Sequence, residues 1–70
     1  MKNLLQRLDP EVKTKLDLVI LEHPDTAQII TDSLTATDNV YKLSFGTMSY
    51  MQMFLGIDLD SFYYIFDYND

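Results

Sequence analysis

The hydrophobic positions in the first half of the chain recur with the period of an amphipathic α-helix. Four aliphatic residues occupy positions i, i+4, i+7 and i+8 and so share one predicted helix face: Val12, Leu16, Val19 and Ile20. Asp9 can cap this helix, and Pro10 fits its first position, where no amide donor is needed. Pro24 disfavours helical geometry in the residue before it. The pattern therefore predicts a helix that begins at Pro10 and ends at about His23.

A second helix is predicted to begin at Pro24. Three apolar residues at helical spacing form its inner face: Ala27, Ile30 and Leu34. Asp25 can cap this helix, with Gln28 three residues later as its capping partner. Residues 35–39 are rich in Thr, Asp and Asn, whose side chains bond the nearby backbone. They predict a loop or the cap of the next element.

Residues 40–45 carry two overlapping patterns. Tyr41, Leu43 and Phe45 alternate with the other three residues in the period of a strand. The same segment fits a short helix that ends at Gly46. We favour the helix, because a lone strand would have to pair with another molecule.

A further helix is predicted from Thr47, which can cap it, to Leu55, with Gly56 closing its C-terminus. Ser49 and Gln52 are its only other polar residues. A helix that is apolar nearly all round either lies at the centre of the core or contacts a partner as well as the core.

The last helix is predicted after Gly56, with Asp58 or Asp60 as its cap. Its inner face holds the residues at i, i+3, i+4 and i+7: Leu59, Phe62, Tyr63 and Phe66. Its opposite face is acidic and aromatic: Asp60, Tyr64, Asp67 and Tyr68.

Residues 49–66 resemble a helix-turn-helix in outline, because two short predicted helices are joined at Gly56 and Ile57. The second helix offers Asp and Tyr where a DNA-reading helix offers Arg, Lys, Asn or Gln. The fold class predicted for residues 1–70 is a small all-α single domain. It has four or five short helices and a helix-turn-helix-like C-terminal half.

Composition and charge restrict the classes of function. The 70 residues include no Cys, which excludes disulfides and thiolate metal sites, and the net charge is -6. All five basic residues precede position 43, so the acidic C-terminal part argues against binding to nucleic acid. The N-terminus does not match a signal peptide, and no stretch is apolar enough to cross a membrane. We expect a soluble, cytoplasmic protein.

No residue pattern in the sequence predicts catalysis. His23 is the only His and has no second His or Cys to share a metal or a proton-transfer role. Asp58 and Asp60 lack the remaining ligands of a calcium loop, and Gly46 and Gly56 lie too far apart for a phosphate-binding loop. We therefore expect no enzymatic activity, no catalytic residue, no cofactor and no metal.

The expected function is binding to another protein. Six residues are the candidates for partner binding: Asp60, Tyr64, Asp67, Tyr68, Met51 and Tyr50. Tyr and Met suit adaptable apolar contacts, and uncompensated Asp favours a partner with a basic patch. The hypothesis is an inhibitor, adaptor or regulator, of the kind that phages and mobile elements encode. A structural protein that forms homodimers or larger homo-oligomers, and a degenerate helix-turn-helix regulator, are the alternatives.

Overall fold

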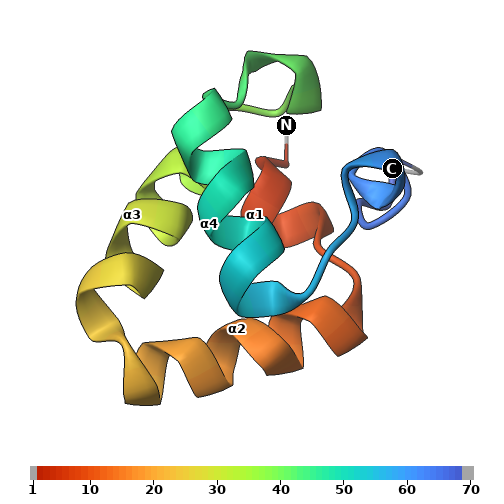
Figure 1. The fold of residues 1–70 in the computed structure, drawn as a ribbon. Helices are drawn as coiled ribbons and strands as arrows, with labels where there is room; N and C mark the ends of the chain where they lie inside the picture. Colours follow the sequence, from red (N-terminus) through yellow and green to blue (C-terminus); the bar gives the residue numbers. More distant parts are fainter. Residues whose placement is uncertain (1, 69–70) are drawn as a thin grey trace.

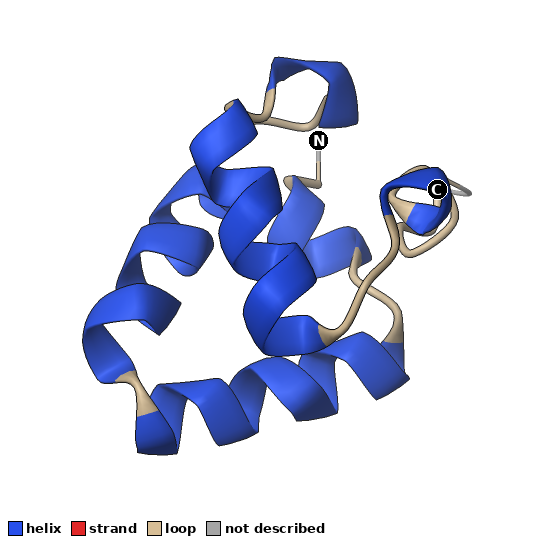
Figure 2. Ribbon diagram, in the orientation of Figure 1, coloured by secondary structure: helices blue, strands red, loops and turns tan. Residues whose placement is uncertain are grey.

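The computed structural model describes residues 2–68, which form four α-helices and two 3-10 helical turns. Their order along the chain is α1 (Leu4–Arg7), α2 (Pro10–Glu22), α3 (Pro24–Thr35), η1 (Val40–Lys42), α4 (Phe45–Leu55) and η2 (Leu59–Ser61). Within these residues there is no strand, and the predicted small all-α domain is confirmed (Figures 1 and 2).

The predicted limits of α2 are confirmed. Asp9 caps the helix, its side chain accepting a hydrogen bond from the Glu11 amide at 2.9 Å, and His23 follows the last turn. The inner face is buried as predicted at Val12, Leu16 and Val19, but Ile20 is 43% exposed. At about 100° per residue, Ile20 lies at the margin of this face, which explains its exposure.

The predicted inner face of α3 is also confirmed, since Ala27, Ile30 and Leu34 are all buried. The predicted capping pair is wrong. His23 occupies the N-cap without a side-chain hydrogen bond, and Asp25 lies inside the first turn. Gln28 instead donates to Asp32 at 2.7 Å, one turn further along the helix.

Helix α4 contacts both α2 and α3, and α1 packs on α3 (Figure 1). The innermost side chains come from all four α-helices: Leu4, Leu16, Ile30, Leu34, Met51 and Leu55. Thr47 is a buried polar residue, and its hydroxyl bonds Ser33 of α3 at 2.8 Å and Ser44 at 2.9 Å. These hydrogen bonds fix the start of α4 against α3.

The segment 40–45 contains a helical turn and no strand, as we favoured. The turn is shorter than the predicted helix. It covers only Val40–Lys42, and α4 begins at Phe45 with Ser44 as its N-cap. Gly46 therefore lies in the first turn of α4 instead of ending a helix, and Thr47 is not the cap.

Gly56 ends α4 as predicted, with φ 65° and ψ 35° in the left-handed region. The helix predicted to follow it is wrong, because only the 3-10 turn η2 forms and residues 62–65 continue as turns. The helix-turn-helix outline therefore lacks its second α-helix. Phe62 and Phe66 are buried as predicted, whereas Leu59 and Tyr63 are about half exposed.

The C-terminal segment pairs with the N-terminal segment instead. Leu8 and Phe66 form an antiparallel bridge. The Asp67 amide donates to the Arg7 carbonyl, and the Asp9 amide donates to the Ile65 carbonyl, both at 2.7 Å. We call residues 7–9 and 65–67 the terminal clamp.

Arg7 strengthens the terminal clamp through its side chain. The residue is charged but buried, with 8% of its surface exposed. Its Nη1 donates to the Asp67 carbonyl at 3.1 Å and its Nε to the Lys2 carbonyl at 3.3 Å. Helix α1, which carries Arg7, was not predicted from the sequence. It is a single turn that Asn3 and Gln6 cap by reciprocal hydrogen bonds.

The two glycines are expected to respond to alanine with opposite signs. Gly56→Ala should lower the free energy of unfolding by about 1 kcal/mol, because Ala disfavours the left-handed conformation. Gly46→Ala should raise it by about 0.5 kcal/mol, because Gly46 is helical and an added Cβ meets only Ser44 Oγ, at 3.9 Å. Urea unfolding of both variants measures the difference, and equal signs would contradict these backbone assignments.

Candidate protein-binding surface

The structure separates the six candidate binding residues. Asp60, Tyr64, Asp67 and Tyr68 are exposed and lie in or after η2. Tyr50 is 37% exposed on α4, where its ring packs on Phe54 with a centroid distance of 6.4 Å.

Met51 is fully buried and cannot contribute to a surface. It shares the inner face of α4 with Thr47 and Leu55, which are also buried. These three residues are spaced by four, so they form one stripe along the helix. The prediction of Met51 as a partner-binding residue is therefore corrected to a core position.

Three tyrosines near the C-terminus and one from η1 form one group, which we call the tyrosine cluster: Tyr41, Tyr63, Tyr64 and Tyr68. Tyr63 is its centre. The Tyr63 ring stacks on Tyr68 with centroids 5.1 Å apart, meets Tyr64 edge-on at 5.9 Å and lies 6.3 Å from Tyr41. Tyr41 and Tyr64 are 82% and 80% exposed, so the outer members of the cluster are accessible to a partner.

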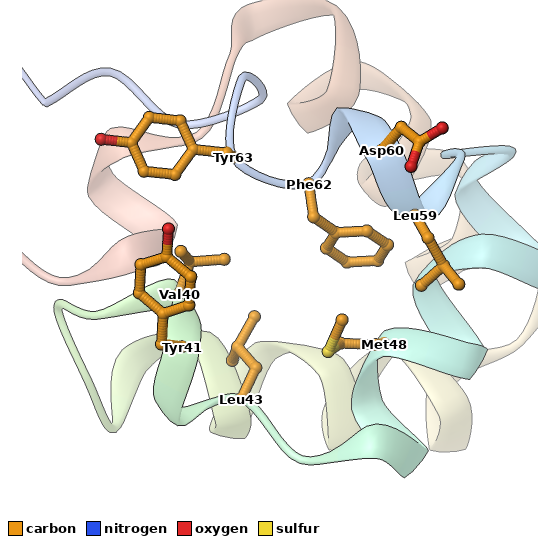
Figure 3. A pocket seen from close by; sticks show the side chains of 8 residues that line it. All are labelled: Val40, Tyr41, Leu43, Met48, Leu59, Asp60, Phe62 and Tyr63. Atoms are coloured by element: carbon orange, nitrogen blue, oxygen red, sulfur yellow. The ribbon is translucent and has the colours of Figure 1, made fainter.

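A hollow of about 330 Å³ lies beside the tyrosine cluster (Figure 3). Eight residues line it: Val40, Tyr41, Leu43, Met48, Leu59, Asp60, Phe62 and Tyr63. Val40, Leu43 and Phe62 are buried and give it an apolar base. Figure 3 shows Tyr41 and Tyr63 on one side of the Phe62 ring and Leu59 and Asp60 on the other.

The residues after position 42 bring only negative charge to this surface. Asp58, Asp60 and Asp67 are exposed, and the sequence has no Lys or Arg after Lys42. Partial burial raises the pKa of the Tyr68 phenol above its usual value of 10.0, and the neighbouring Tyr63 and Tyr41 add to this rise while Arg7 opposes it. The Tyr68 phenol is therefore neutral at physiological pH.

Sequence reasoning identified only part of this surface. The sequence pattern places Tyr41 in an ambiguous strand or helix and Tyr63 on an inner helix face. The position of Tyr41 follows from the packing of η1 near residues 59–63, which no local pattern indicates. The concentration of aromatic residues after position 40 was the one available signal.

Within residues 2–68, no group of three His, Asp or Glu residues is arranged to hold a metal ion. No helix among the same residues combines the length and the apolar character needed to cross a membrane. His23 is exposed, and its ring meets the Phe54 ring edge-on at 5.1 Å.

No protein-family model matches the chain, and neither does any curated protein or solved structure with which it was compared. Similarity therefore gives no indication of function. The function must be inferred from the tyrosine cluster, the hollow and the charges around them.

Proposed function

We propose that the protein is a non-enzymatic interaction protein that binds another protein through the tyrosine cluster and the adjoining hollow. It acts there as an inhibitor, adaptor or regulator of a partner with a basic surface. The observation that carries this proposal is the continuous group of four tyrosines beside an apolar hollow. Tyr is enriched at protein interfaces, because its ring offers apolar area and a hydrogen bond with few rotatable bonds.

The charges support a basic partner. Asp60 is an exposed carboxylate at the hollow, and Asp58 is exposed two residues before it. Complementary charge speeds the encounter of two proteins, while buried aromatic contacts slow their dissociation. The absence of Cys fits a reducing compartment, which is why we place the interaction in the cytoplasm.

The binding rates of two variants test this proposal once affinity capture has supplied the partner. Asp60→Asn should slow association and reduce its dependence on salt, because exposed charges act over a screened distance. Tyr64→Ala should speed dissociation about fivefold or more, the loss expected for a hot-spot ring. Surface plasmon resonance at two ionic strengths measures both rates.

Each variant has a matched control outside the proposed surface. Asp25→Asn removes the same charge from the start of α3, and Phe45→Ala removes an exposed aromatic ring from the start of α4. Both controls should bind with wild-type rates while circular dichroism shows an intact fold. If Asp60→Asn and Tyr64→Ala also leave the rates unchanged, the partner binds elsewhere. A dimer mass in solution that Tyr64→Ala abolishes would indicate the homo-oligomer alternative.

A further inference from the structure

The hollow has the character of a receptor for one apolar side chain. Its base consists of the buried Val40, Leu43 and Phe62, and its sides include the half-exposed Leu59. Its volume of about 330 Å³ is at the lower limit of small-ligand sites, about 300 Å³. A single large side chain that enters it leaves water for an apolar surface, which is favourable in proportion to the area buried.

The rim of the hollow is charged on one side only. Asp60 is exposed, and it is the only carboxylate among the residues within 2–68 that line the hollow. Lys and Arg are absent from the same lining within that range. The phenols of Tyr41 and Tyr63 supply neutral hydrogen-bonding groups across from it (Figure 3). The charge of the rim therefore favours a cation over an anion.

We propose that the hollow receives a large apolar side chain, aromatic or leucine-like, from a partner segment in which a Lys or Arg accompanies this anchor and meets Asp60. This inference rests on the proposed function and specifies which chemistry the partner presents. The apolar anchor side chain is complementary to the apolar base of the hollow, and the adjacent cation is complementary to the Asp60 carboxylate at its rim.

A second copy of this chain fits the hollow poorly. The chain has a net charge of -6, and only five of its residues are basic. One of the five, Arg7, is buried in the terminal clamp. Two copies joined at their hollows would bring Asp60 of each close to the acidic surface of the other, and like charges oppose such a contact. Charge complementarity therefore favours a different, basic protein.

Small molecules that carry only the proposed features test the inference without the partner. The probe is 2-phenylethylammonium, an aromatic group with a nearby cation, and it is compared with neutral 2-phenylethanol and anionic 3-phenylpropanoate. Titration of the full chain, followed by NMR of the side chains, should show saturable shifts at Val40, Leu43 and Met48. The cation should bind with a millimolar dissociation constant, about threefold tighter than the alcohol, with the anion weakest.

Two variants separate the charge of Asp60 from the net charge of the protein. Asp60→Asn should abolish the preference for the cation, so that 2-phenylethylammonium and 2-phenylethanol bind with similar dissociation constants. Asp25→Asn removes the same charge outside the hollow and should keep the preference. Shifts centred away from the hollow, the absence of saturable binding, or equal effects of the two variants would overturn the inference.

The outcome is independent of the rate measurements that test the proposed function. If the binding rates depend on Tyr64 but the probes do not bind in the hollow, the proposed binding surface is supported and the proposed anchor side chain is rejected. Probes that bind the hollow together with rates insensitive to Tyr64 and Asp60 would reject the proposed interface instead.

Discussion

Leu16→Ala is expected to lower the free energy of unfolding by about 2 to 5 kcal/mol, the range for truncating a large buried side chain. Leu16 is 1% exposed at the middle of α2, on the face that packs on α3 and α4. A domain of this length has a total stability of roughly 4 to 10 kcal/mol. The variant should therefore unfold at a much lower urea concentration than the wild type, as followed by circular dichroism.

Leu21→Ala makes the same chemical change on the same helix and serves as the control. Leu21 is 80% exposed, so its truncation should change the stability by no more than about 0.5 kcal/mol. The difference between the two variants isolates burial from helix propensity, because both replace Leu by Ala within α2. Similar losses of stability in both variants would contradict the assignment of the buried face.

The helices that the sequence predicts well are those with local signals at both ends. Asp9 and Pro10 begin α2, and Pro24 separates it from α3. Gly56 ends α4 because its left-handed conformation favours glycine. In each case the residues that determine where a helix begins or ends lie within one helical turn of that end. Periodicity then identifies the buried face without knowledge of the neighbouring helices.

The C-terminal segment shows where this reasoning fails. Leu59, Phe62, Tyr63 and Phe66 have helical spacing, but residues 62–65 form turns after η2. Their backbone groups find partners far away in the sequence, since Ile65 and Asp67 bond residues 9 and 7. Tertiary contacts of this kind can outweigh intrinsic helix propensity, which contributes less than about 1 kcal/mol per residue. The two halves of the terminal clamp lie more than 50 positions apart in the sequence, so a local residue pattern cannot predict their pairing.

The candidate surface was predictable in composition but not in geometry. Asp60, Tyr64 and Tyr68 were chosen because aromatic and acidic residues gather near the C-terminus, and all three are exposed. Met51 belongs to a run of methionines whose spacing is more often that of a core than of a binding surface, and it is buried. The hollow depends on the approach of η1 to residues 59–63. The position of Tyr41 beside Tyr63 at the hollow is visible only in the three-dimensional structure.

Arg7→Met is expected to lower the free energy of unfolding by about 2 to 3 kcal/mol. Methionine retains much of the apolar volume but cannot donate to the carbonyls of Lys2 and Asp67. Hydrogen bonds that involve a charged group contribute about 1.5 to 3 kcal/mol each, and the burial of the methionine side chain offsets part of the loss of two such bonds. Lys15→Met is the control, because Lys15 is an exposed cation on α2 and its loss should change the stability by about 0.5 kcal/mol at most.

The positions at which amide protection falls distinguish a local opening of the terminal clamp from a general weakening of the core. In Arg7→Met, amide hydrogen exchange should accelerate most at Asp9 and Asp67, whose amides form the two clamp hydrogen bonds. The Leu16 amide in α2 should be affected less, since regions of a protein can open separately. In Leu16→Ala, by contrast, the protection of α2 should fall as well.

The same variant links the terminal clamp to the tyrosine cluster. Tyr68 follows Asp67 directly, and its ring stacks on Tyr63 at a centroid distance of 5.1 Å. Release of Asp67 should therefore disturb the stacked pair and weaken partner binding, although Arg7 itself is buried. Equal acceleration of exchange at Asp9, Asp67 and Leu16 would show that Arg7 supports the whole domain. In that case the ends of the chain have no separate role in ordering the binding surface.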